Sequence, residues 1–172
     1  MIRLLGVVLT MGATLWFGAY FAMKEKYRLQ ELEELQRALL YLQGQIGYLS
    51  APLAEALESI SWKTGGQLGG IFQKTAEQLA ARQGETAEEI WQRIWREEVV
   101  HTFLTGEDLD ALLVFGRSLG YLDKTQQENS IQLLLRYIED ALTKGRKRLE
   151  KNGRLYYGMG CLSGLLIVVT LL

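Results

Sequence analysis

The chain has 172 residues, of which 48% are hydrophobic and 23% charged, and its net charge at pH 7 is −1. It contains one histidine, His101, and one cysteine, Cys161. This content excludes a disulfide framework and a metal quartet of cysteine and histidine, and it leaves His101 without a thiol partner for catalysis.

The chain begins with an apolar run, residues 4–23, in which 20 consecutive residues carry no charge. A helix of that length is roughly 30 Å long, which matches the hydrocarbon core of a bilayer. We therefore expect a transmembrane helix over residues 2–23. A cleaved signal peptide is the alternative, but no small-x-small cleavage site follows, and Tyr20 and Phe21 suit the aromatic belt of a membrane interface.

Residues 24–154 show a helical pattern throughout, because apolar residues recur at steps of three and four. We expect six helices, over about 29–49, 52–62, 67–83, 86–103 and 105–120 and from residue 123 into the basic segment that follows. The apolar stripes predict a core of Leu29, Leu32, Leu39, Leu42, Ile46, Leu49, Leu53, Ala56, Leu57, Ile60, Leu68, Ile71, Phe72, Thr75, Leu79, Ile90, Trp91, Ile94, Trp95, Ile131, Leu134, Leu135, Ile138 and Leu142.

Local signals mark the ends of these helices. Pro52 is expected to open the second helix, and Gly84 to end the third in a left-handed conformation. Thr86 and Glu89 form the sequence pattern of a capping box, and Asp123 with Gln126 forms another. Short loops make consecutive helices antiparallel, so an even number of helices returns the chain to the membrane-facing end of the bundle at which it entered. An antiparallel six-helix bundle therefore agrees with a chain anchored at both ends.

Nine basic residues lie next to the two apolar runs and form a predicted membrane-surface face: Lys24, Lys26, Arg28, Lys144, Arg146, Lys147, Arg148, Lys151 and Arg154. By the positive-inside rule, they place the domain of residues 24–154 in the cytoplasm and both termini outside the cell membrane. Residues 29–143 carry nine basic and 18 acidic side chains, a net charge of −9. We therefore expect no nucleic-acid ligand, because the basic cluster is predicted to face lipid. The acidic surface fits either a basic partner or simple solvation.

The second apolar run, residues 155–172, predicts another transmembrane helix, since its 18 residues also lack charge. A buried core helix is the alternative. Gly160 and Gly164 have the spacing with which small residues pack one membrane helix against another.

No pattern for catalysis, for a cofactor or for a metal is found. There is no Glu-x-x-His pair for a di-iron bundle, and Gly65-Gly66 is not followed by the Gly-Lys-Ser/Thr of a phosphate-binding loop. We expect a protein that is not an enzyme and that holds no cofactor.

Several motifs exceed what any helix bundle would carry. Ile46-Gly47-Tyr48 precedes Pro52-Leu53-Ala54-Glu55-Ala56, Trp91 follows, and Phe115-Gly116-x-x-Leu119-Gly120-x-x-Asp123-x-x-x-Gln127 comes later. With the bracketing apolar runs and the total length, the whole chain resembles the stage III sporulation protein AB family of endospore-forming bacteria.

The resemblance implies a role as well as a fold. The family is similar to the cytoplasmic helical domains of the platform proteins of type II secretion and type IV pilus systems. Its members are expected in the mother-cell membrane around the forespore, within a secretion-like channel. A companion cytoplasmic secretion-type ATPase and other membrane components of the channel are the implied partners. The motif residues are then either structural or partner-facing.

We therefore expect a scaffold that docks the ATPase. The rival hypothesis is a membrane-tethered sensor or transporter accessory protein, which predicts a sizeable apolar pocket between helices.

Overall fold

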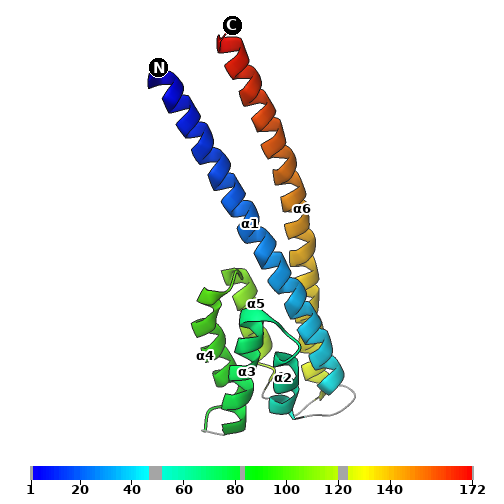
Figure 1. Cartoon of the computed structure of the whole chain (residues 1–172). Coiled ribbons are helices and arrows are strands. Elements are labelled where there is room, and N and C mark those ends of the chain that lie inside the picture. Colours follow the sequence, from blue (N-terminus) through cyan, green and yellow to red (C-terminus); the bar gives the residue numbers. More distant parts are fainter. Residues whose placement is uncertain (1, 47–51, 82–83, 120–123, 172) are drawn as a thin grey trace. The chain divides into compact units, whose positions relative to one another are not determined.

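The computed structural model describes the backbone of residues 2–46, 52–81, 84–119 and 124–171, and the side chains of Tyr20 and residues 23–46, 52–81, 84–119 and 125–151. Regular structure within these residues is entirely helical (Figure 1). The elements are α1 (Ile2–Gly44), α2 (Leu53–Ser61), α3 (Gly66–Ala81), α4 (Ala87–Glu98), the 3-10 helix η2 (Val99–His101), α5 (Gly106–Gly116) and α6 (Lys124–Leu171). The all-α prediction with six α-helices is confirmed for the described part of the chain.

The chain divides into two compact units. The bundle unit, Arg28–Leu142, contains α2 to α5 with the adjoining parts of α1 and α6. The terminal unit comprises Met1–Tyr27 and Thr143–Leu172.

Among the described residues, no helix has both the length and the unbroken apolar character that crossing a bilayer demands. The side chains of both predicted spans, including Gly160 and Gly164, lie almost wholly outside the described residues. The spans and the domain limits at residues 23 and 155 therefore remain predictions.

The core of the bundle unit follows the predicted stripes closely. Each helix buries one face, from Leu32 on α1 to Ile138 on α6, both with no exposed surface. Leu53 and Leu79 are only half-buried, because they lie at the same open end of the antiparallel α2–α3 hairpin. Leu49 lies outside the described residues. Burial of these stripes stabilises the short helices α2, α4 and α5, which would be marginal in isolation.

Four aromatic rings fill the centre between α3, α4 and α5. Trp91 and Trp95 have ring centroids 5.4 Å apart, and Phe72 lies 6.3 Å and 6.0 Å from them. Phe115 meets Trp91 edge to face at 5.3 Å. Tilted and edge-to-face pairs at these separations are the arrangements that the ring quadrupoles favour.

The predicted capping box at Thr86 is confirmed, and a second, unpredicted one starts α5. The Thr86 side chain accepts a hydrogen bond from the Glu89 backbone N–H, and the Glu89 carboxylate accepts from the Thr86 N–H at 2.8 Å. Thr105 begins α5 in the same way. Asp123 of the other predicted box lies outside the described residues.

Two predicted helix ends are wrong, and one start needs adjustment. α4 ends at Glu98 and the 3-10 helix η2 continues only to His101, and beyond it the Phe103 N–H donates to the Glu31 carboxylate of α1 at 2.7 Å. α5 ends at Gly116, not at residue 120, and the Ser118 hydroxyl donates to the Phe115 carbonyl at 2.7 Å in the turn that follows. Pro52 has ψ 142°, so it precedes α2 and does not form its first turn. Gly84, with φ 87°, has the predicted left-handed conformation.

Candidate functional site

The family motif residues of α4 and α5 form a single packing contact. The Trp91 side chain is completely buried, and its indole N–H donates to the Leu112 carbonyl oxygen at 2.8 Å. A Cβ atom added to Gly116 would overlap Cδ1 of the Trp91 ring and would lie 3.0 Å from two other atoms of that ring, Cγ and Nε1. Glycine at this position therefore lets α5 approach the tryptophan, and the motif specifies how two helices pack.

The other motif residues differ in their environment. Leu119 is buried and Gln127 half-buried, whereas Pro52 and Glu55 are exposed at the start of α2. Gly120 and Asp123 lie outside the described residues. The motif thus combines core positions with an exposed segment on α2.

A buried ion pair joins α1 to α5. The Arg28 guanidinium donates to the Asp108 carboxylate through Nε at 2.7 Å and through Nη2 at 2.8 Å, and the two side chains are 8% and 1% exposed. The Tyr137 hydroxyl of α6 donates to the same carboxylate at 2.8 Å. Because Arg28 is buried in this pair, its predicted place on a lipid-facing surface is wrong.

Asp108 also closes the N-terminus of α5. Its Oδ2 accepts from the Thr105 backbone N–H at 2.8 Å and from the Thr105 hydroxyl at 2.7 Å. Burial acts to raise the pKa of Asp108, but the hydrogen bonds from Arg28, Thr105 and Tyr137 outweigh it and lower the pKa below its ordinary value. The pKa of Tyr137 is raised by its burial and by its hydrogen bond to the Asp108 carboxylate. One carboxylate thus connects α1, α5 and α6.

A signal for this pair is present in the sequence. Arg28 precedes Leu32 and Leu35 by four and seven residues, which places it in phase with the buried stripe of α1. Asp108 precedes Leu112 by four and Phe115 by seven in the same manner. The same spacing relates Glu31 to the buried Leu35 and Ala38, yet Glu31 is only half-buried, so phase favours the burial of each charge without deciding it or naming the partner.

The remaining residues of the predicted membrane-surface face belong to the terminal unit. Lys24, Lys26, Lys144, Arg146, Lys147, Arg148 and Lys151 are exposed. Arg154 lies outside the residues whose side chains are described. Contact of these residues with lipid headgroups stays a prediction.

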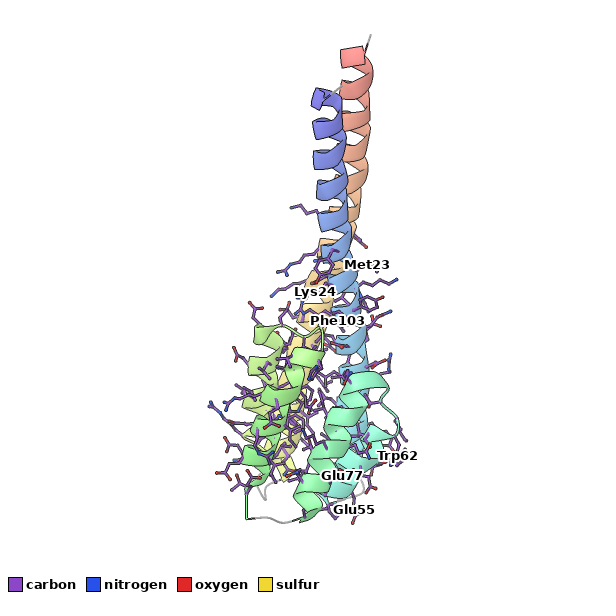
Figure 2. The ribbon with its side chains drawn as sticks, turned by 60° about the vertical axis from the view of Figure 1, so that its left-hand side comes forward. Met23, Lys24, Glu55, Trp62, Glu77 and Phe103 are labelled. Carbon is purple, nitrogen blue, oxygen red and sulfur yellow. The ribbon has the colours of Figure 1, made fainter. Side chains whose placement is uncertain are left out.

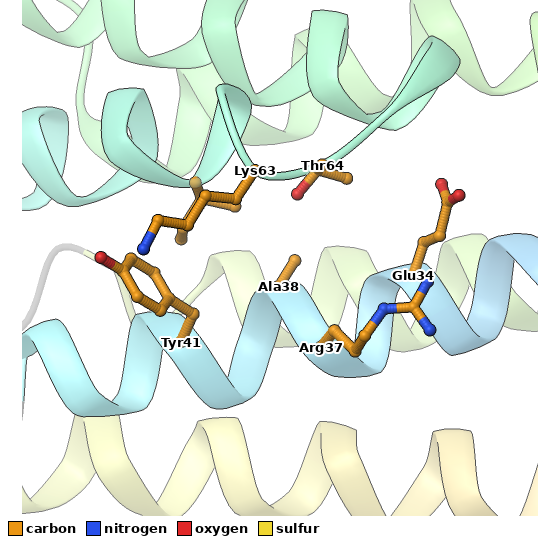
Figure 3. A pocket seen from close by; sticks show the side chains of 7 residues that line it. Glu34, Arg37, Ala38, Tyr41, Lys63 and Thr64 are labelled. Atoms are coloured by element: carbon orange, nitrogen blue, oxygen red, sulfur yellow. The ribbon is translucent and has the colours of Figure 1, made fainter.

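The rival ligand-binding hypothesis needs a pocket, and two clefts of the bundle unit bear on it. The first, of about 250 Å³, lies between α1 and the α2–α3 turn, where the Lys63 ammonium lies 3.6 Å from the centre of the Tyr41 ring (Figure 3). Interaction with Lys63 lowers the pKa of Tyr41 to about 8. Glu34 and Arg37 also line this cleft.

The second cleft is larger, about 530 Å³, and is lined by charged and polar side chains such as Glu89, Arg93 and Glu97. Small-molecule sites are typically 300–1,000 Å³ and mainly apolar. The first cleft is below this size and the second is too polar. Within the described residues there is also no group of three potential metal ligands.

Comparison with known proteins gives consistent results. The family model described as stage III sporulation protein AB matches residues 3–172. The stage III sporulation protein AB of Bacillus subtilis (strain 168) is 27% identical over 172 residues, which cover 100% of both chains. A solved structure of a stage III sporulation protein AB superposes with a TM-score of 0.67 at 22% identity, covering 72% of this chain and 97% of that one. The likeness of this structure supports the helical fold.

Proposed function

Because the chain belongs to the stage III sporulation protein AB family, we propose that it is a non-enzymatic membrane component of a secretion-like channel between mother cell and forespore, required for sporulation. In this role the bundle unit is a scaffold that docks a secretion-type ATPase. The family match over residues 3–172 is the observation that carries the proposal.

The proposed location is the mother-cell membrane around the forespore. The bundle unit faces the cytoplasm, both termini lie outside, and the basic side chains of the terminal unit contact anionic lipid. Cysteines introduced near each terminus in a Cys161→Ser background test this topology. The variants are produced in vegetative cells, where the outer face of the cell membrane is accessible; labelling of both cysteines by a membrane-impermeant reagent on these intact cells is expected, and labelling only after lysis contradicts it.

Two properties support a scaffold role. The bundle unit has a rigid aromatic centre and a buried ion pair that fix its helices, as a docking platform requires. Residues 29–143 carry a net charge of −9, which favours a partner with a basic surface.

Co-purification tests the proposal directly. The full-length protein, expressed in sporulating cells at native level, is isolated from detergent-solubilised membranes and analysed for the companion ATPase. We expect the ATPase to be retained, and to be lost at high salt because the contact is electrostatic. Absence of the ATPase from native membranes that contain the wild-type protein contradicts the scaffold role.

A further inference from the structure

A shallow groove runs along the outer side of the α2–α3 hairpin, with a volume of about 250 Å³. Its floor consists of the small side chains Ala54, Ala76 and Ala80. Small residues at these positions lower the surface between two helical ridges. This α2–α3 groove has the form in which a helix of another protein can be received.

The ridge on the α2 side ends in Trp62, which is 79% exposed and is the most exposed large hydrophobic side chain among the described residues. Trp62 directly follows the last residue of α2. Its ring makes no contribution to the core, in contrast to the completely buried Trp91 and Trp95. Exposed tryptophans beside a groove are typical anchors of protein interfaces.

The charge of the groove is uniformly negative. Glu55 and Glu58 stand on the α2 ridge with Trp62, and Glu77 stands opposite on α3, where it accepts a hydrogen bond from Gln73 at 3.0 Å. Figure 2 shows Glu55, Trp62 and Glu77 gathered at this hairpin. No lysine or arginine lines the groove.

Some acidic side chains of the bundle unit are neutralised by the chain itself. Glu98 pairs with Lys74 at 2.7 Å, and Glu85 pairs with Arg93 at 2.7 Å. Glu55 and Glu58, by comparison, have no ion-pair partner among the described residues. Three carboxylates beside an exposed indole ring therefore favour a partner that brings a cationic group to this groove.

We propose that the α2–α3 groove is a docking site for a helical segment of a protein partner that carries an arginine or lysine beside a small apolar face. The cationic group stacks on Trp62 and pairs with Glu55 and Glu58, and the apolar face covers the alanine floor. The site deepens the scaffold function proposed above, on which it rests, because it gives the ATPase a defined contact surface.

The experiment uses the full-length protein co-expressed with the companion ATPase. A photo-crosslinking amino acid replaces exposed Ala80 in the groove floor, so that Trp62 stays intact, and a second protein carries it at exposed Leu133 of α6 as control. Binding is measured separately by co-purification. We expect crosslinks to the ATPase from position 80 and none from position 133.

Substitutions then test the chemistry. Trp62→Ala is expected to weaken ATPase binding at least about tenfold, since tryptophan is among the residue types most often found as interface hot spots. Glu55→Lys with Glu58→Lys is expected to weaken it to a similar extent. The matched controls on α6, Leu133→Ala and Glu139→Lys, remove an exposed apolar group and an exposed acid without altering binding. Near-ultraviolet circular dichroism confirms that the variants keep the tryptophan core.

Each outcome has a distinct meaning. If the wild-type protein retains the ATPase but position 80 does not crosslink to it and the groove variants bind normally, the groove assignment is overturned and the scaffold function stands. If Trp62→Ala weakens binding and the charge reversals do not, the basic partner segment is overturned. Crosslinking of position 80 to a second copy of this chain, or to lipid alone, overturns the docking site as well. If the wild-type protein retains no ATPase, both proposals fail together.

Discussion

The buried ion pair gives the sharpest prediction. In the Asp108→Asn variant, the amide keeps one acceptor oxygen where the carboxylate now accepts from Arg28, Thr105 and Tyr137. The amide nitrogen then faces hydrogen-bond donors, and the guanidinium of Arg28, 8% exposed, no longer faces the negative charge of Asp108. Removing one partner of a buried pair costs about 3–5 kcal/mol, because the remaining charge stays desolvated. We expect a loss of this size in the free energy of unfolding.

Urea unfolding of the full-length protein in detergent micelles, followed by tryptophan fluorescence, measures this loss. A double-mutant cycle with Arg28→Met separates the pair from other effects. The double variant is expected to be more stable than Asp108→Asn alone by about 2 kcal/mol, since it no longer buries a guanidinium against a neutral amide. A loss below about 1 kcal/mol for Asp108→Asn, or simple additivity of the two substitutions, would refute the reasoning.

Three further predictions follow from the same structure. Gly116→Ala forces a Cβ atom into the Trp91 ring and should lower the free energy of unfolding by about 1–3 kcal/mol. Gly70→Ala, in a helix with open space around the glycine, should raise it by about 0.5–1 kcal/mol. Equal effects of the two substitutions would contradict the close approach of α5 to Trp91. The buried Trp95 indole nitrogen has no hydrogen-bond partner among the described residues, whereas that of Trp91 donates to the Leu112 carbonyl. Trp95→Phe should therefore lower the free energy of unfolding by about 1 kcal/mol less than Trp91→Phe in the same urea assay, and the reverse order contradicts this reasoning. Because the pKa of Asp108 is lower in the folded protein than its value of about 3.9 in the unfolded chain, its ionised carboxylate stabilises the fold at a pH above about 3.9, and this contribution is lost as the pH falls through the folded-state pKa. The difference in unfolding free energy between wild type and Asp108→Asn should therefore narrow below about pH 4, and a difference independent of pH contradicts the ion pair.

The helices and most of their core could be predicted from the sequence because their signals are short-range. A stripe such as Leu32 to Leu42 and a capping box such as Thr86 with Glu89 depend on residues three to four positions apart, which a helix brings together wherever it lies. The errors are at helix ends. Beyond the end of α4, Phe103 contacts Glu31 of α1, and such contacts leave no local pattern.

The candidate docking site was predicted only in outline. The sequence shows an excess of acidic residues over residues 29–143, but it does not distinguish acids that the chain pairs internally, such as Glu98, from those left on the groove, such as Glu58. It also does not distinguish Trp62 from Trp91, since both stand in helical segments beside apolar residues. Exposure depends on which face of a helix finds a neighbour.

The sequence by itself determined the helical class, the capped helix starts, the separation of charge and the family resemblance, all of which are properties of composition and of near neighbours along the chain. Only the tertiary structure decided the place of Arg28. A basic residue beside a predicted membrane span reads as lipid-facing, yet its partner Asp108 is 80 residues away along the chain. Folding brings the two charges to 2.7 Å, and at that distance, shielded from water, their attraction and hydrogen bonds fix the position of the side chain.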